Sequence, residues 1–249
     1  MRVSRIVALA RALLVAAGGA LAKTSRTTSG GGFGGFGPSL VFADFAGLNS
    51  AFARAGITQK LDPMHWMFGG SGYAFIDRIV IGGMGWGGSQ SVASDSLRAR
   101  VSLSSGEFDV GYSVLSIPHV VVTPMLGIGG GGYTVELERL TGSVPNFDSL
   151  LRCPGRTSSA SLSSFTLNPQ LMVTIPISFV GLQLRGGYLF SPAASEWELA
   201  DGGALLSGPT VAKGAPYVSL NIVFGGMSTN TPRVRVHTSR QENDEDESR

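Results

Sequence analysis

The chain contains three histidines, His65, His119 and His237, which are its best candidates for proton transfer or metal binding. A serine nucleophile needs a base within hydrogen-bond reach, and a zinc site needs three or four ligands at suitable spacing. The three histidines lie on separate predicted segments, and no serine has a recognisable activating neighbour. We therefore expect no catalytic residue, no metal and no cofactor.

The glycine-rich runs at residues 82–88 and 127–132 raise the question of a phosphate-binding loop. Such a loop lies between a strand and a helix and is followed by Lys-Ser or Lys-Thr, and neither condition holds here. The chain has 36 glycines but only 14% charged residues, against roughly 25% in soluble domains. Glycine within a strand suits places where the backbone bends or packs closely, so these runs favour a narrow barrel.

The elements that would position any site are strands. Apolar residues occupy alternate positions at residues 97–103, 165–175, 180–190 and 218–224. A period of two indicates strands with two different faces. One face is apolar and the other is small or polar, which is typical of a closed barrel in a lipid bilayer.

The polar faces of these strands supply the candidate site. With Val101, Leu171 and Leu184 directed toward lipid, the opposite positions project into the lumen. The predicted lumen-lining residues are Arg98, Arg100, Asn168, Gln170, Gln183, Arg185 and Asn221. A charge on the lipid side would cost about 2–4 kcal/mol near the midplane, which supports this assignment. The arginines would either form a constriction that selects anions or fill the lumen and pair with carboxylates such as Glu107 and Asp109.

The predicted fold class is all-β, a single antiparallel up-and-down β-barrel of eight strands. Residues 96–115 could form two strands, or one strand with a bulge at Gly106. One strand gives an even total and a strict alternation of short and long connections, which is the outer-membrane pattern. Short links are expected at 77–78, 116–118 and 176–178, and long ones at 44–63, 89–95, 138–159 and 192–213.

A short helix is predicted in the first long connection. Phe45, Leu48 and Phe52 fall at i, i+3 and i+7, Asp44 is a candidate N-cap, and Gly56 ends the pattern. The apolar stripe of this helix is expected to pack on the mouth of the barrel.

The ends of the chain differ in character from its middle. The expected divisions are a signal peptide at 1–22, a Gly/Ser-rich linker at 23–32, a transmembrane barrel at 33–224 and a disordered charged tail at 225–249. Removing the three arginines of the leader from the 19 basic residues leaves 16, against 17 acidic ones. No basic patch with interleaved aromatic residues remains, so we expect no nucleic-acid partner.

Two segments carry a resemblance to a known group of proteins. Residues 217–224 alternate and end in Phe, and residues 116–127 combine a short turn with a Gly-rich strand. The chain is similar in these respects to small bacterial outer-membrane β-barrels of the porin-like superfamily. The resemblance implies the outer membrane of a Gram-negative-type bacterium, contact with outer-membrane lipid and recognition by the barrel-assembly machinery. Members of that superfamily differ widely in activity, so it implies no single function.

Three functional hypotheses follow. The first is a non-enzymatic outer-membrane barrel with a structural or binding role, or a narrow channel for small solutes. The second is a soluble exported carrier of lipocalin type, which would place large apolar residues inside and polar ones outside. The third is a lipid-modifying enzyme built around His65 and a serine or aspartate at the outer rim.

Overall fold

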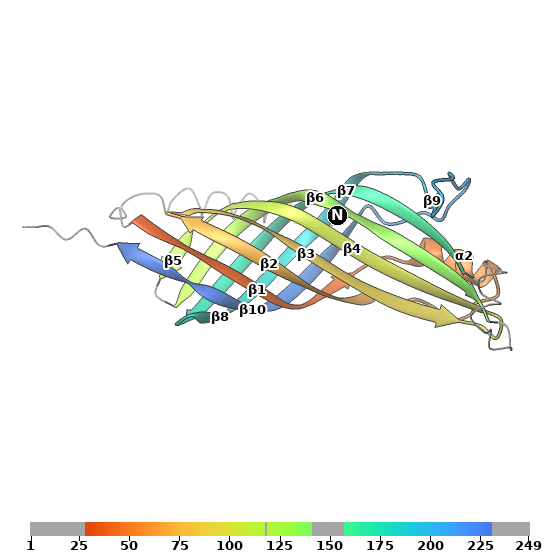
Figure 1. Ribbon diagram of the computed structural model, residues 1–249, viewed down its shortest axis with the longest axis horizontal. Coiled ribbons are helices and arrows are strands. Elements are labelled where there is room, and N and C mark those ends of the chain that lie inside the picture. The colour runs from red at the N-terminus through yellow and green to blue at the C-terminus, as the bar shows by residue number, and fades with distance from the viewer. Residues whose placement is uncertain (1–27, 118, 141–156, 231–249) are drawn as a thin grey trace, which may run out of the picture.

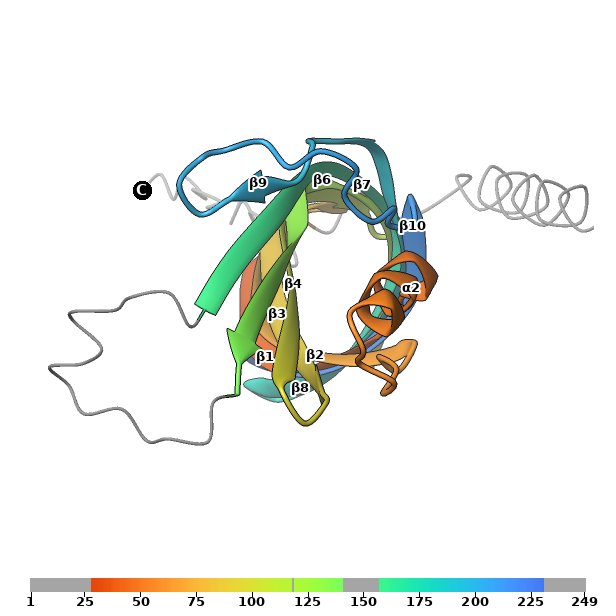
Figure 2. The same cartoon turned by 90° about the vertical axis from the view of Figure 1, so that its right-hand side faces the viewer.

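The computed structural model describes residues 28–117, 119–140 and 157–230. Within them the chain forms a closed antiparallel barrel with a helix at one end (Figures 1 and 2). The eight long strands are β1 (Thr28–Phe42), β2 (Met64–Ile76), β3 (Ile79–Ala93), β4 (Leu97–Tyr112), β6 (Val120–Arg139), β7 (Thr157–Ile177), β8 (Val180–Ala194) and β10 (Gly214–Asn230). The shorter elements are α2 (Ala46–Arg54), β5 (Leu115–Ile117) and β9 (Glu198–Leu199). Because β1 pairs with β10 and β6 with β7, the sheet closes, and the predicted all-β, eight-strand fold is confirmed.

The strand register fixes the tilt of the barrel. Following hydrogen-bonded partners once around the barrel from Val41 leads back to Gly31, ten residues earlier on the same strand. The path passes through Tyr217, Gly187, Gln170, Met125, Gly111, Val80 and Phe75. Eight strands with this stagger tilt by about 40° from the barrel axis, which is usual for a small barrel.

The two rims of the barrel are unlike each other. One rim, which we call the turn rim, carries the tight β2–β3 and β7–β8 connections, and both turns use a left-handed residue, Asp77 and Ser178. The beginning of β1 and the end of β10 also lie there. The other rim, which we call the loop rim, carries α2 and the β8–β10 connection (Figure 2).

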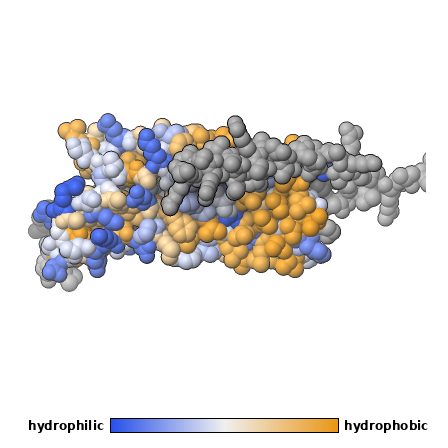
Figure 3. Space-filling view, turned by 180° about the vertical axis from the view of Figure 1, so that it is seen from behind, coloured by the Kyte–Doolittle hydropathy of each residue, from blue (hydrophilic) through white to orange (hydrophobic). Residues whose placement is uncertain are grey.

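A band of exposed apolar side chains surrounds the turn-side half of the barrel. Its members include Trp66, Phe68 and Ile76 on β2, Phe108 and Val110 on β4, Leu171 and Ile175 on β7, Leu182 and Leu184 on β8, and Leu220 and Ile222 on β10. Figure 3 shows apolar side chains gathered over this half and a mixed, more hydrophilic surface toward the loop rim. Trp66 and Ile76 are separated by roughly 25 Å along the barrel axis at this tilt, the height of the apolar band of membrane barrels.

The paired strands extend beyond the bounds of 33–224 that were predicted for the barrel. Strand β1 begins at Thr28, inside the predicted linker 23–32, and β10 continues to Asn230, inside the predicted tail 225–249. Strands β1 and β10 pair through their backbones as far as Thr28 and Asn230. This pairing does not depend on side-chain type, so it continues beyond the residues in which apolar and polar side chains alternate. The predicted signal peptide 1–22 and the rest of the tail lie outside the described residues.

The connections near β4 also differ from the prediction. Strand β3 runs to Ala93, so the expected long link 89–95 is a turn of three residues, 94–96. Strand β4 is a single strand as predicted, but no bulge occurs at Gly106, since its register with β3 and β6 is continuous. No helix in the described part of the chain is long and apolar enough to cross a bilayer.

Helix α2 forms where the apolar stripe predicted it. Leu48 and Phe52 are buried toward the barrel, and Gly56 follows the helix with a positive φ of 84°. The N-cap is Phe45 rather than Asp44, although a carboxylate oxygen of Asp44 accepts a hydrogen bond from the backbone N–H of Ala46 at 2.8 Å. The helix therefore packs its apolar face onto the loop rim.

Candidate functional site

The interior of the barrel is divided into three layers along its axis. Nearest the turn rim is an apolar cluster of Phe33, Tyr73, Phe75, Val80, Val121, Met125, Met172 and Val223. A polar layer follows at the level of the middle of the apolar band. A second apolar cluster fills the loop-side half and extends to α2, and it includes Val41, Phe45, Leu48, Phe52, Trp86, Ala99, Val101, Leu103, Leu162 and Trp197.

Five strands contribute to the polar layer, and side chains from four of them, β2, β4, β7 and β10, form a hydrogen-bonded network. Asn168 on β7 donates to Glu107 on β4 at 2.5 Å and to the Tyr217 hydroxyl on β10 at 3.0 Å. Gln170 donates to Asp109 at 2.7 Å and accepts from Tyr217 at 3.0 Å. On β2, the Tyr73 hydroxyl donates to the second carboxylate oxygen of Asp109, and β8 contributes Arg185. The network therefore connects strands on opposite sides of the lumen.

Arg185 is the cation of this layer and is only 1% exposed. Its Nη2 donates to Gln183 Oε1 at 2.7 Å, its Nη1 contacts the Met84 sulfur, and its guanidinium lies 5.0 Å from the centre of the Tyr73 ring. Among the described residues it has no carboxylate oxygen within 4.0 Å. The charge is therefore held by an amide, a sulfur and an aromatic face, while Glu107 and Asp109 act on it from a greater distance.

The layer is densely packed. Asp109, Asn168 and Gln183 are fully buried. A Cβ atom at Gly127 would lie 2.6 Å from Asp109 Oδ1 and 2.8 Å from Glu107 Oε2, so the glycine leaves room for both carboxylates. Of the two sequence hypotheses for this region, the packing favours a lumen filled by side chains over a selective constriction.

The structure divides the seven predicted lumen residues into two groups. Five of them face the interior and are buried: Asn168, Gln170, Gln183, Arg185 and Asn221. The other two, Arg98 and Arg100, are exposed on the outside of the barrel, so this part of the prediction is wrong. Val101, which we expected to face lipid, is 1% exposed and lies inside.

The error has a physical cause. Arg98 and Arg100 lie beyond the apolar band, where the outer surface is mixed and more hydrophilic and the interior is an apolar core. Arg98 instead forms an exposed ion pair with Glu138 on β6 at 3.1 Å. Leu171 and Leu184, within the band, do face outward as predicted.

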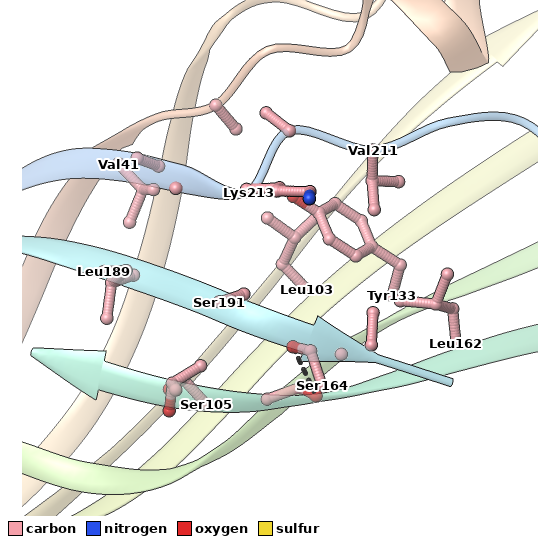
Figure 4. Close-up of a pocket in the computed structure, with 18 of the residues that line it drawn as sticks. Val41, Leu103, Ser105, Tyr133, Leu162, Ser164, Leu189, Ser191, Val211 and Lys213 are labelled. Atoms are coloured by element: carbon pink, nitrogen blue, oxygen red, sulfur yellow. Dashed lines mark hydrogen bonds between the residues drawn. The ribbon is translucent and has the colours of Figure 1, made fainter. Parts of the chain in front are cut away.

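The loop-side half also contains a cavity that the sequence analysis did not find. It has a volume of about 160 Å³ and lies on the loop-rim side of the polar layer. Figure 4 shows the residues that line it. Its apolar wall is formed by residues including Val41, Met67, Leu103, Leu162, Leu189 and Val211. Because its lining comes from strands and loops far apart in sequence, no local pattern marked it. The one sequence signal that could have suggested an apolar interior there is the residue type at every second position of β4 and β7, the positions that the structure shows to be buried.

The polar lining of the cavity is sparse. Lys213, just before β10, is the one charged residue among those that line it. Thr166 on β7 is 4% exposed, and its buried hydroxyl has no hydrogen-bond partner in the described structure. Ser164 lies two residues away and donates to the Gly131 carbonyl at 3.2 Å.

The β8–β10 connection lines the cavity at the loop rim through residues such as Val211 and Lys213. Helix α2 packs against this connection, because its backbone at Gly47 lies directly against the Thr210 carbonyl. Within that connection, Trp197 Nε1 donates to the Pro209 carbonyl at 2.8 Å. Toward the turn rim, the Trp86 and Tyr217 rings meet edge to face with centroids 4.6 Å apart. Tyr217 thus belongs to the polar layer through its hydroxyl and to the apolar cluster of the loop-side half through its ring.

The third sequence hypothesis depended on His65. Its ring is fully buried at the base of the α2 loop, with Nδ1 2.9 Å from the Gln90 amide nitrogen and its ring centre 5.9 Å from that of Phe45. Gln90 also exchanges hydrogen bonds with the Asp62 backbone at 2.9 Å. These contacts anchor the loop to β3, and they include neither a serine nor an aspartate side chain that His65 could activate.

Comparison with solved structures finds other barrels. Ail, the attachment invasion locus protein of Yersinia pestis, solved with the heparin analogue sucrose octasulfate, is 11% identical with a TM-score of 0.46, over 80% of this chain and 99% of that one. A major outer membrane protein of Thermus thermophilus is 11% identical with a TM-score of 0.42, over 79% and 99%. The outer membrane protease OmpT of Escherichia coli is 10% identical with a TM-score of 0.35, over 85% and 100%. No protein-family model and no curated protein sequence matches the chain.

Proposed function

We propose that this protein is a non-conducting, non-enzymatic β-barrel of the Gram-negative outer membrane that binds a small apolar molecule in its loop-side half. The observation that carries the proposal is the contrast within the lumen. At the level of Arg185 and Asp109 the interior is filled by buried side chains, whereas a cavity of about 160 Å³ lies above them. Binding sites for small molecules are typically concave and mostly apolar, with few polar groups.

The exterior supports a membrane location. An apolar band surrounds the turn-side half, and charged side chains such as Arg98 and Glu138 lie outside it. A soluble carrier of lipocalin type would need the reverse exterior at this level, with polar residues at positions such as Leu184 and Leu220. The closed sheet also leaves no exposed strand edge in the bilayer, which a spanning β-structure requires.

The orientation follows from the rims. Membrane barrels of bacteria have short periplasmic turns and longer outer loops, so the turn rim would face the periplasm and α2 the exterior. The partners in this arrangement are outer-membrane lipid around the band and the barrel-assembly machinery, to which β10 would be presented as the last strand.

A planar-bilayer recording tests the absence of conduction. The refolded protein, whose insertion is verified by heat-modifiable migration on gels, should give no single-channel steps. Regular steps from the wild-type protein would contradict the proposal, because they would require a passage through the Arg185 layer.

Ligand binding by the cavity is tested with a neutral apolar probe, octanol, in lipid nanodiscs, with protein-free nanodiscs to subtract partitioning. Ser164→Leu fills the cavity and should reduce octanol binding at least tenfold, because no space then remains for the hydrocarbon chain of octanol. Ser163→Leu is the matched control, since Ser163 is exposed on the outer face of the same strand. Equal binding by both variants would overturn the assignment of the site.

A further inference from the structure

The charge distribution of the cavity indicates the sign of its ligand. Lys213 is the one charged side chain among the described residues that line the cavity; it is exposed at the loop rim, and no carboxylate oxygen of a described residue lies within 4.0 Å of its ammonium group. Its backbone is fixed, since its carbonyl accepts a hydrogen bond from the Ser191 N–H at 2.7 Å. Figure 4 shows the Lys213 side chain among the lining residues with its nitrogen over the cavity. An exposed cation at the edge of an apolar space suits an anionic head group.

The apolar wall limits the size of the rest of the ligand. A cavity of about 160 Å³ is close to the roughly 150 Å³ engineered cavity that accepts one benzene molecule. Val41, Leu162 and Leu189 give it aliphatic walls without a charge. This space fits one short hydrocarbon chain and excludes the several long chains of a membrane lipid.

Thr166 provides a second, independent indication of a ligand. Its hydroxyl is buried in the wall and has no partner in the described structure, and a buried hydroxyl that stays unpaired is unfavourable. Thr166 lies on a strand of the cavity wall, whereas Lys213 lies in the connection at the loop rim. A ligand whose head group is held by Lys213 could therefore form a hydrogen bond with Thr166 through a hydroxyl group on its hydrocarbon chain.

We infer that the cavity binds a free medium-chain carboxylate, with its carboxylate on Lys213 and its chain against the apolar wall. This inference rests on the proposed function and names the ligand class of the same site. A hydroxyl on the chain adds a hydrogen bond to Thr166, so hydroxylated acids of this length are preferred over unsubstituted ones.

The test measures equilibrium binding of octanoate, octanol and 3-hydroxyoctanoate to the full protein in nanodiscs. Lys213→Gln should weaken octanoate binding by about tenfold and leave octanol unchanged, because only the charge-assisted contact is lost. Lys60→Gln is the matched control, since Lys60 is exposed in the α2 loop and does not line the cavity. Thr166→Val should remove the preference for 3-hydroxyoctanoate and leave octanoate binding within twofold.

The outcomes separate the inference from the proposed function. Octanol binding that is lost in Ser164→Leu, together with octanoate binding that does not depend on Lys213, would overturn the anionic ligand and keep the apolar site. Binding of neither probe to the wild-type protein would overturn both. Binding that is equal in Lys213→Gln and Lys60→Gln would likewise contradict the role of the cation.

Discussion

Strand β4 passes through both halves of the barrel, and its two ends use the same alternation in opposite ways. In the turn-side half, Phe108 and Val110 face outward while Glu107 and Asp109 are buried inside. In the loop-side half, the inward residues are apolar, Ala99, Val101 and Leu103, and the outward ones include Arg98 and Arg100. The strand contains no bulge between the two halves.

The proposed membrane location accounts for this difference, because the medium around the barrel, rather than the backbone, would then decide which side is polar. Inside the band, the exterior would meet hydrocarbon and the interior can hold a hydrogen-bonded network. Beyond the band, the exterior would meet water and the barrel needs a conventional apolar core for its stability. The cavity lies in that second region. The interior is already apolar there, so the apolar lining of a binding site is compatible with the residues around it.

The largest effect is expected from a charge placed inside the loop-side half. Val101→Asp puts a carboxylate into the apolar core without a partner and should lower the free energy of unfolding by about 3–5 kcal/mol. This change in the free energy of unfolding is measured by urea denaturation of the protein in lipid vesicles, monitored by tryptophan fluorescence. Ser102→Asp, one residue away on the outer face, should change stability by less than about 0.5 kcal/mol. A larger loss for Ser102→Asp would mean that the faces are assigned the wrong way round.

A second comparison uses two outward positions of β4, ten residues apart. Val110→Arg places a cation on the lipid face near the middle of the band and should lower stability by about 2–4 kcal/mol. Arg100→Val removes a cation from the same face beyond the band and should change stability by no more than about 0.5 kcal/mol. Vesicle unfolding measures both. Similar values for the two variants would place the edge of the membrane elsewhere.

A third comparison concerns the polar layer, which has two carboxylates and one cation. Arg185→Gln removes the bond to Gln183 and the contact with the Tyr73 ring, and it leaves both carboxylates without their cation. We expect a loss of about 1.5–3 kcal/mol in the free energy of unfolding. Adding Glu107→Gln should recover part of it, because one negative charge then disappears. A loss in the double variant equal to the sum of the two single losses would show that Glu107 does not act on Arg185.

Much of the fold could be predicted from local patterns, and the reason is the strict period of two within the band. Leu171, Leu184 and Gln170 were placed correctly because the strands within the band have an apolar outer face and a polar inner face. Arg98 and Arg100 could not be placed in this way, since a strand that passes beyond the band keeps its period and reverses its polarity. The ends of β1 and β10 were missed because backbone pairing leaves no mark on side-chain type.

The cavity could be predicted least, because it depends on contacts between segments distant in sequence. Lys213 and Thr166 come from different elements, and neither stands in a motif. Only closure of the barrel, with its specific stagger, brings them around the same space. The apolar wall residues can be read from the sequence, but the space that remains between them depends on how they pack in three dimensions.

The smallest effect is expected at the exposed ion pair of the loop-side half. Arg98→Ala should lower the free energy of unfolding by only about 0.2–1 kcal/mol, because Arg98 and Glu138 are about half exposed and their attraction is weakened by water. At 1 M salt, where the screening length is about 3 Å, most of that difference should disappear. A double-mutant cycle with Glu138→Ala, measured at 0.1 and 1 M salt, isolates the pair. If the coupling stayed above 1 kcal/mol at high salt, the pair would be shielded from water, and the outer surface at this level would not be the aqueous one that the comparison of the two halves requires.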